Sequence, residues 1–415
     1  MNSVPKPLTI PFDVEGVRRD FPVLARIVNG HPLAYLDNGA SAQRPASVIE
    51  TLEDYQRRHH ANVHRGVHTL SQEATTLFEG ARERLVRFVN AASTRELIFV
   101  RGTTEAINLV AQSHGRASLR EGDEILITGL EHHANIVPWQ LLCGQTGAKL
   151  VVAPIDQDGE VHLAAVESRM TARTRILAFA HASNALGTVL PAAQLIAAAK
   201  ARGIVTVVDG AQAVPHLRVD VRALGCDFYA FSGHKMFGPS GIGVLYGREA
   251  MLEKMPPWQG GGDMILTVSF EKTTYNALPY KFEAGTPNIE GAVGLGAAVD
   301  YLERMDAAGA HAHEAALLDY ATRALTAVPG VRIIGTARNK LSLVSFVVDG
   351  VHPHDLGTIL DEQGIAIRTG HHCAMPVMEF FDVPATARAS FAFYNTFAEA
   401  DRLAAAVDGA RKLFA

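Results

Sequence analysis

A stretch near the middle of the chain, residues 227–235, places a reactive side chain directly after a hydrophobic run. It reads Asp-Phe-Tyr-Ala-Phe-Ser-Gly-His-Lys, so aromatic residues give way to small and polar ones and then to Lys235. A lysine at the end of a sheet strand can be partly desolvated, which lowers its pKa and favours a nucleophile or a Schiff base. An exposed lysine after a buried strand is the ordinary alternative, so the residues placed around Lys235 decide between the two.

Polar side chains follow several other predicted strands. Between residues 96 and 235, short β-rich segments alternate with helical ones, which predicts parallel strands in a doubly wound α/β sheet. Ligands of such sheets bind beyond the carboxyl ends of the strands. The polar residues at these ends are Thr103, Thr104, His132, Asn184, Asp209, Gln212, Ser232, His234 and Lys235. A set of hydroxyl, imidazole, amide, carboxylate and amine groups on one rim indicates a binding site.

The start of the helix after the strand at 96–100 is a candidate anion site. Gly102, Thr103 and Thr104 would present first-turn N–H groups and hydroxyls, and the helix dipole favours a phosphate there. Threonine also caps helices where no ligand binds, so this motif alone is modest evidence for an anion site. A phosphate site, a Schiff-base lysine and a carboxylate together suit pyridoxal 5'-phosphate, because the carboxylate keeps the pyridine nitrogen protonated and the ring then accepts electrons.

A second reactive centre lies at residues 368–376, which read Arg-Thr-Gly-His-His-Cys-Ala-Met-Pro. Cys373 follows a glycine and two imidazoles, a polar setting that favours a thiolate, whereas Cys143 and Cys226 lie in apolar or helical contexts typical of inert cysteines. The histidines could instead be metal ligands, as could those at 59–68. A zinc site needs four ligands, and Gly66 and β-branched neighbours weaken the helix that would align the latter group, so we predict no metal.

The chain as a whole has the composition of an ordinary soluble enzyme. Lys+Arg 38 against Asp+Glu 43 gives a net charge of -5, which argues against a nucleic-acid partner. The first residues have no signal-peptide core, and no apolar run is long enough to cross a membrane. Three widely separated cysteines do not form a disulfide framework, so we expect a cytoplasmic protein.

The pattern of predicted elements changes after a small-residue helix near residue 291. This change indicates a domain boundary. We predict an N-terminal arm over 1–30 that packs with the small domain, a large α/β domain over 31–304 and a smaller α+β C-terminal domain over 305–415. Residues 241–246 are expected to form an antiparallel strand of the large sheet, and 343–348 and 365–367 strands of the small domain.

Taken together, these motifs resemble the class V aminotransferases of fold-type I pyridoxal-phosphate enzymes, and among them the group II cysteine desulfurases of the SufS type. The resemblance covers nearly the whole chain and rests on eight stretches that surround Asp37, His64, Thr103, His132, Asp209, Lys235, Thr286 and Cys373. It implies a large domain with a mainly parallel sheet, a small C-terminal domain carrying the cysteine loop, and a homodimer.

The resemblance also implies a role for each site residue. Lys235 would hold the cofactor as a Schiff base and move the substrate α-proton, Asp209 would pair with the ring nitrogen, and His132 would stack on the ring. Asn184 and Gln212 would address the phenolic oxygen and the substrate side. The phosphate ligands would be Thr103, Thr104, Ser232 and His234, with Thr286 from the second subunit. The substrate would meet Arg388, Asn184, His64 and Arg368, with Arg388 binding its carboxylate.

Cysteine desulfuration is the reaction implied by this family. L-cysteine would become L-alanine, Cys373 would carry the persulfide, and a SufE- or SufU-like protein would accept the sulfur for iron–sulfur cluster assembly. One alternative is a selenocysteine lyase, which releases selenide from L-selenocysteine and need not use Cys373. Another is a different class V transaminase or lyase, which also needs no cysteine in this loop. A non-enzymatic metal-binding protein using His60, His64, His371 and Cys373 is an alternative from a different class.

Overall fold

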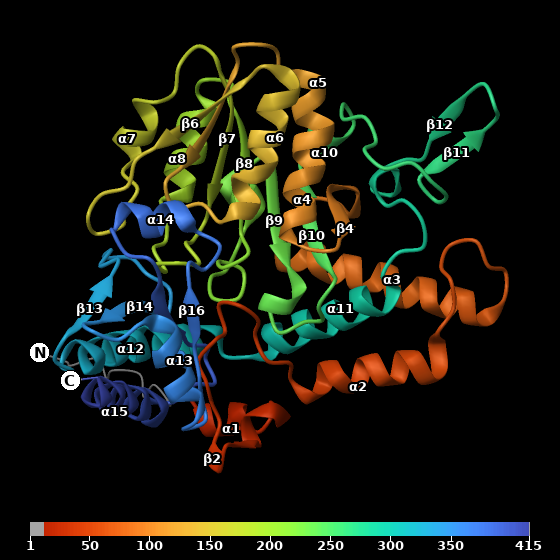
Figure 1. Cartoon of the computed structure of the whole chain (residues 1–415). Helices are drawn as coiled ribbons and strands as arrows, with labels where there is room; N and C mark the ends of the chain where they lie inside the picture. Colours follow the sequence, from red (N-terminus) through yellow and green to blue (C-terminus); the bar gives the residue numbers. More distant parts are fainter. Residues whose placement is uncertain (1–11, 415) are drawn as a thin grey trace, which may run out of the picture.

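A seven-stranded sheet is the largest element of the computed structural model, which describes residues 12–414 (Figure 1). In spatial order its strands are β4 (Leu97–Val100), β10 (Gly243–Gly247), β9 (Phe228–Ser232), β8 (Val205–Asp209), β7 (Thr174–Ala180), β5 (Glu124–Thr128) and β6 (Lys149–Ala153). Strand β10 is antiparallel to both of its neighbours, and the other pairs are parallel. The predicted fold class and the antiparallel strand are therefore confirmed.

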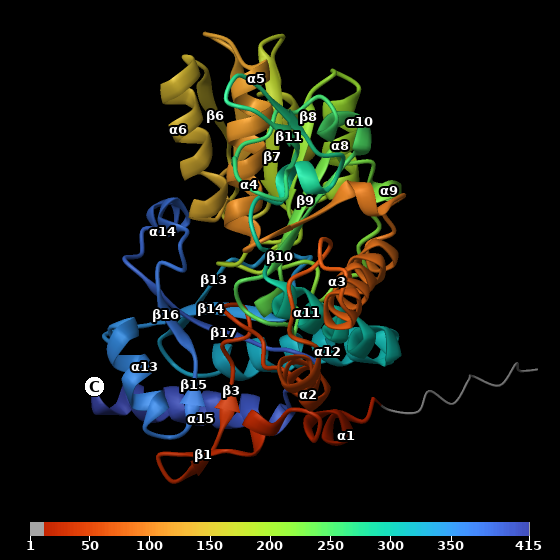
Figure 2. The same ribbon diagram turned by 90° about the vertical axis from the view of Figure 1, so that its right-hand side faces the viewer.

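Helices cover both faces of this sheet because its buried strands carry apolar side chains on each face (Figure 2). On β5, Leu126 lies in one core cluster, and Ile125 and Ile127 lie in the other. The first cluster includes side chains of α3 (Thr69–Phe88), α8 (Ala192–Lys200) and α11 (Ile289–Arg304). The second includes side chains of α4 (Thr103–Val110) and α6 (Val137–Thr146). The sheet is thus fixed between two helical layers, and its carboxyl-terminal edge stays open.

Small residues allow α3 and α11 to pack closely. A Cβ atom added to Gly296 would lie 3.0 Å from the Cβ atom of Ala81, which is closer than such atoms normally approach. The close approach explains the glycine- and alanine-rich sequence of α11 that the chain shows from residue 291 onward.

A second, antiparallel sheet lies in the C-terminal part of the chain. Its spatial order is β13 (Val331–Ile334), β14 (Leu343–Val348), β17 (Thr386–Ser390) and β16 (Arg368–Gly370). The helices that share a core with this sheet are α12 (Ala307–Thr326), α13 (Pro353–Asp361) and α15 (Phe397–Leu413). The short helix α14 (Met375–Phe380) follows the cysteine loop. The strand predicted over 343–348 is therefore present as β14.

The predicted division at 304/305 coincides with the junction between α11 and α12 and stays a prediction. One strand crosses it: β3 (Ala34–Tyr35) pairs in parallel with β15 (Ile365–Ala366), and Ala34 and Leu36 lie in the core of the C-terminal sheet. Residues 34–36, counted with the large domain from sequence, therefore pack with the C-terminal part. Of the predicted arm, residues 1–11 lie outside the described residues, and Arg18 contacts Glu399 of α15 at 3.1 Å.

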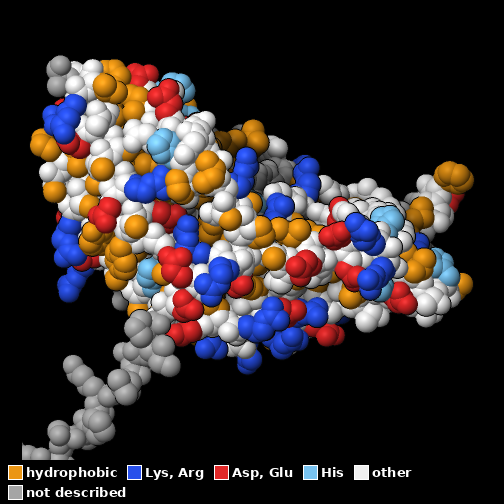
Figure 3. All heavy atoms as spheres, turned by 90° about the horizontal axis from the view of Figure 1, so that it is seen from below, with side chains coloured by type: hydrophobic (Ala, Val, Ile, Leu, Met, Phe, Trp, Pro, Cys, Tyr) orange, Lys and Arg blue, Asp and Glu red, His pale blue; other side chains and the backbone are white. Residues whose placement is uncertain are grey.

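A β-hairpin of β11 (Ile265–Val268) and β12 (Thr273–Tyr275) projects from the body of the molecule (Figure 1). The remaining α-helices and β-strands are α1 (Val14–Arg18), β1 (Ile27–Val28), β2 (His31–Pro32), α2 (Ala46–Asp54), α5 (Arg116–Ser118), α7 (Leu163–Glu167), α9 (Val221–Leu224) and α10 (Glu249–Leu252). On the face drawn in Figure 3, acidic and basic side chains are interspersed. Within residues 12–414, none of the helices has the length and apolar character needed to span a bilayer.

Candidate active site

A cavity of about 300 Å³ opens at the carboxyl-terminal edge of the central sheet and is closed from the other side by the C-terminal part. Among the residues that line it are Thr103, Thr104, His132, Asn184, Asp209, Gln212, Ser232, His234, Lys235, Arg368, Cys373 and Arg388. Side chains from the ends of five strands therefore meet the cysteine loop in one place, as the doubly wound topology predicts.

Asp209 and Lys235 form the electrostatic centre of the cavity. Asp209 ends β8, is buried, and its Oδ1 accepts a hydrogen bond from the N–H of Ala211 at 2.9 Å. Burial raises the pKa of this carboxyl, against the effect of Lys235. Burial also lowers the pKa of Lys235 to about 8, although Asp209 opposes the change. The neutral, nucleophilic form of the amine is therefore far more accessible near neutral pH than in an ordinary lysine, as a Schiff-base lysine requires.

Gly210 lets the chain pass close to the ring of Tyr229 directly after Asp209. A Cβ atom at this position would lie 2.0 Å from the Cε1 atom of Tyr229, so no other residue fits without displacing that ring. The hydroxyl of Tyr229 is held by the Nδ1 atom of His181 at 2.8 Å. The backbone after Asp209 is therefore packed against a ring that is itself held by a hydrogen bond.

His132 is held as a neutral imidazole. Burial, followed by the charge of Lys235, lowers its pKa to about 4. Its Nδ1 atom accepts a hydrogen bond from the N–H of Ala134 at 2.9 Å, so the ring proton resides on Nε2. A neutral ring of fixed tautomer can stack on an aromatic cofactor and donate a single proton at a defined position.

Hydroxyl and backbone N–H groups also line the cavity. The Ser232 Oγ atom accepts a hydrogen bond from the N–H of Thr103 at 2.9 Å and lies 2.8 Å from the Thr103 Oγ1 atom. These groups lie at the first turn of α4, and Thr104 and His234 line the same cavity. A helix start with clustered hydroxyls suits a phosphate dianion. Together with Asp209 and Lys235, the donor set fits pyridoxal 5'-phosphate.

Two arginines that line the cavity share one carboxylate, an arrangement that the sequence did not reveal. Arg388, only 2% exposed, donates from Nη1 to the carbonyl of Asn184 at 2.8 Å and from Nη2 to the Asp37 Oδ1 atom at 3.3 Å. Arg368 binds both oxygens of Asp37, at 3.1 and 2.8 Å. Burial lowers the pKa of Arg388 to about 10, so the guanidinium stays charged at neutral pH. Asp37 therefore orients both cations, although its motif predicted only a strand end.

Two further side chains are engaged with protein groups beside the cavity. Gln212 donates from Nε2 to the carbonyl of Gly39 at 2.7 Å, and Asn184 donates from Nδ2 to the carbonyl of His372 at 2.5 Å. Asn184 thus connects the end of β7 to the cysteine loop. Its predicted role beside the cofactor stays a prediction.

Cys373 is exposed and lines the same cavity as Lys235. The other two cysteines differ from it as predicted: burial raises the pKa of the Cys143 thiol and raises that of Cys226 to about 12. Of the three, Cys373 is therefore the thiol that faces the candidate centre.

Two predicted site residues do not line this cavity. The Nε2 atom of His64 lies 2.8 Å from the Glu79 carboxylate, and its ring packs against Tyr280. Within one chain the structure therefore does not support His64 as a substrate ligand, because the left-handed turn at this residue directs it toward α3. Thr286 is exposed, and its predicted role in a second subunit stays a prediction.

The histidine arrangement also differs from the metal-binding alternative. His64 is committed to Glu79 rather than lying beside Cys373. Instead, His133 joins His371 and Cys373, and one ligand atom from each lies within 4.8 Å of the others. The prediction of no metal at this position stays a prediction.

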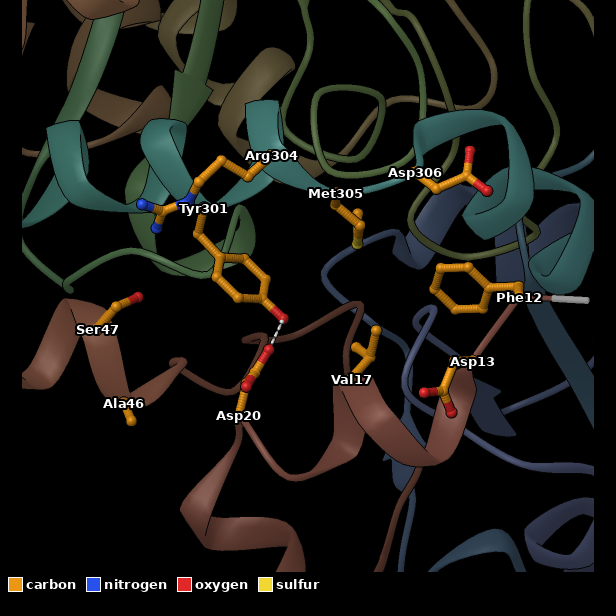
Figure 4. Close-up of a pocket in the computed structure, with 10 residues that line it drawn as sticks. All are labelled: Phe12, Asp13, Val17, Asp20, Ala46, Ser47, Tyr301, Arg304, Met305 and Asp306. Atoms are coloured by element: carbon orange, nitrogen blue, oxygen red, sulfur yellow. Dashed lines mark hydrogen bonds between the residues drawn. The ribbon is translucent and has the colours of Figure 1, made fainter. Parts of the chain in front are cut away.

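A larger hollow of about 680 Å³ lies between the N-terminal arm and the junction of α11 and α12 (Figure 4). Tyr301 donates a hydrogen bond to Asp20 there at 2.9 Å. Its acids Asp13 and Asp306 already cap α1 and α12. The groups that suit chemistry converge in the smaller cavity around Lys235.

Comparison with known proteins places the chain among relatives of one kind. Residues 34–403 match the family described as Aminotransferase class-V. A cysteine desulfurase of Cronobacter sakazakii is 54% identical over 395 residues, 95% of this chain and 97% of that protein. The solved cysteine desulfurase CsdA from Escherichia coli has a TM-score of 0.90 at 42% identity and covers 97% of this chain and 100% of its own. The apo cysteine desulfurase from Thermococcus onnurineus NA1 has a TM-score of 0.91 at 38% identity, with coverages of 99% and 100%.

Proposed function

The chain belongs to the class V aminotransferase family, and from that premise we propose that it is a pyridoxal-phosphate-dependent cysteine desulfurase. It converts L-cysteine to L-alanine and leaves the sulfur as a persulfide on Cys373. The observation that carries the proposal is that an exposed cysteine lines the same cavity as a desolvated lysine and a buried aspartate. A transaminase needs the lysine and the aspartate but no thiol there.

The residues that would hold the cofactor are those whose chemistry matches its parts. Lys235 would bind it covalently, Asp209 would face its ring nitrogen and His132 would lie against the ring. Its phosphate would be held by Thr103, Thr104, Ser232 and His234. Bound there, pyridoxal phosphate supplies an electron sink for bond breaking next to the amino-acid α-carbon.

The protein's own groups bind the substrate and move its proton. The buried Arg388 guanidinium offers its planar donors to the substrate carboxylate, and its contacts with Asn184 and Asp37 keep it in place. Lys235 takes the α-proton at Nζ, which its lowered pKa allows near neutral pH. Neutral His132 can donate one proton from Nε2.

The sulfur step is a displacement at the substrate sulfur. The Cys373 thiolate forms a new S–S bond with that sulfur while the substrate Cβ–Sγ bond breaks. The electron pair of the broken bond stays with the carbon fragment, which takes up a proton and leaves as alanine. The two thiols thus become one persulfide and one C–H bond, so no outside oxidant or reductant is required.

The finer assignments belong to the same proposal. A SufE- or SufU-like protein would accept the sulfur for iron–sulfur cluster assembly by a SUF system in the cytoplasm. The enzyme would act as a homodimer in which Thr286, exposed on the chain, contributes to the second subunit's cofactor site. L-selenocysteine would be a further substrate, with selenide as the product.

The test is alanine release by the holoenzyme and its Cys373→Ser variant, with L-cysteine and with L-selenocysteine. We expect the variant to lose turnover of cysteine by at least about a hundredfold, because a hydroxyl cannot accept the sulfur. Cys143→Ser is the matched control and should retain full activity, since this thiol lies away from the cavity. Cysteine turnover at the wild-type rate in Cys373→Ser would overturn the persulfide reaction, and turnover of selenocysteine alone by the wild type would identify a lyase.

A further inference from the structure

The turn that presents Cys373 has an unusual backbone. His372 and Cys373 are consecutive non-glycine residues with φ of 52° and 53°, in the left-handed region that side chains disfavour. Such a turn persists only where surrounding contacts determine it. The contacts that fix it therefore decide where the thiol of Cys373 lies.

Contacts from two other elements hold the residue before the cysteine. The Asn184 side chain, after β7, donates to the carbonyl of His372 at 2.5 Å. The Nε2 atom of His372 lies 2.8 Å from the hydroxyl of Thr386 in β17. These two contacts hold His372 but leave Cys373 and the start of α14 to be fixed separately.

His133, in the segment after β5, supplies that second fixation. Its backbone N–H donates to the carbonyl of Cys373 at 2.7 Å, and its ring Nε2 accepts from the N–H of Met375 at 3.1 Å. One residue therefore binds the chain on both sides of Ala374. Because His133 directly follows His132, the same short segment reaches both the cofactor cavity and the cysteine loop.

His371 completes the arrangement from within the loop. Its Nδ1 atom accepts from the N–H of Cys373 at 3.1 Å, and its ring lies 5.6 Å from that of His133, tilted by 33°. Each ring thus uses one nitrogen to accept a backbone N–H, which only a neutral imidazole can do. Burial, and then the nearby His371, lowers the pKa of His133 and favours this neutral form.

These hydrogen bonds also decide between a clamp and a metal site. Coordination through the accepting nitrogens would displace the N–H groups of Cys373 and Met375. Coordination through the other nitrogens would leave a ring N–H facing a backbone N–H. The observed geometry is therefore that of a clamp on the chain.

We propose that His133 is a positioning residue that holds Cys373 at the substrate sulfur through its ring contact with Met375. The inference rests on the proposed desulfurase reaction, in which the thiol must reach an atom fixed beside Lys235. His133 acts through the loop rather than on the substrate. Its loss should therefore reduce the rate of sulfur transfer and leave the binding of cofactor and substrate unchanged.

The experiment compares His133→Ala with His133→Gln in the holoenzyme, because the glutamine side-chain oxygen reaches the position of Nε2 and can still accept the Met375 N–H. We expect kcat for alanine release to fall at least about fivefold in the alanine variant, roughly the factor that one hydrogen bond is worth. The glutamine variant should recover most of the rate, and KM and cofactor absorbance should be unchanged in both. His162→Ala, which removes a loop histidine bound to Asp156, is the matched control.

Hydrogen–deuterium exchange gives the readout that does not depend on turnover. In peptides covering residues 373–376, exchange should be at least about fivefold faster in His133→Ala and near the wild-type rate in His133→Gln. Equal exchange and equal kcat in the alanine variant and the wild type would overturn the clamp, as would loss of cofactor from the alanine variant. A wild-type enzyme that forms no persulfide on Cys373 would instead refute the proposed reaction itself.

Discussion

Asp37 is the residue whose removal should disturb the substrate site most selectively. The substitution Asp37→Asn keeps the shape of the side chain and removes the charge that Arg388 and Arg368 share. Arg388 is 2% exposed and cannot turn to water, whereas Arg368 can. The loss of stability in Asp37→Asn therefore comes almost entirely from leaving the buried Arg388 guanidinium without its counter-ion.

The size of the effect follows from that burial. Breaking a buried ion pair costs about 3–5 kcal/mol, and we expect the lower end because the Arg388–Asp37 contact is 3.3 Å long. A chain of 415 residues has an unfolding entropy of roughly 0.9 kcal/mol/K, so a loss of about 3 kcal/mol lowers Tm by roughly 3–4 °C.

The assay is thermal unfolding of the holoenzyme with and without L-alanine, the proposed product. Because the alanine carboxylate restores a negative charge beside Arg388, we expect alanine to raise the Tm of the variant more than that of the wild type. Asp408→Asn, which breaks an exposed pair on α15, is the control and should leave both values unchanged. The reasoning is refuted if Asp37→Asn unfolds at the wild-type temperature, or if alanine shifts both proteins equally.

Three further results are expected. Lys235→Ala should lose the visible absorbance of bound cofactor, measured after reconstitution, and a retained band would remove the lysine from its role. Arg82→Ala should lower the free energy of unfolding by about 3–5 kcal/mol in denaturant titration, because Glu283, 2.6 Å away, would be left buried and unpaired. The third result concerns Glu79. Burial raises the pKa of its carboxyl, but hydrogen bonds from His64 and Arg82 outweigh burial and lower that pKa to about 2. The ionised Glu79 therefore contributes stability that is present above about pH 4.5 and is lost as the pH falls toward 2. In Glu79→Gln, the free energy of unfolding should depend less steeply on pH in that range. A slope equal to that of the wild type would contradict this.

The central sheet and the residues at its strand ends could be predicted because both depend on local pattern. The β-rich segments before Thr103, His132, Asp209 and Lys235 define parallel strands, and parallel strands deliver their carboxyl ends to one edge. The motifs around these residues then predict pyridoxal 5'-phosphate as the cofactor, and the match to the class V aminotransferase family confirms this prediction.

The parts that escaped prediction depend on contacts between distant segments. Asp37 meets Arg388 across more than three hundred residues, and no spacing rule links them. His133 has no distinguishing feature beside His132 until the cysteine loop is folded against it. The predicted role of His64 stays a prediction, because within one chain its ring contacts Glu79 and does not line the cavity.

The pairing of β3 with β15 also bears on the order in which the protein is completed during synthesis. Residues 34–36 emerge from the ribosome early but find their partners only when residues 365–390 have been made. The central sheet can form from residues 97–247 in the meantime, since all of its strands lie within that span. The thiol that handles sulfur is therefore among the last groups to reach its place, and a truncated chain that binds cofactor would still lack its nucleophile.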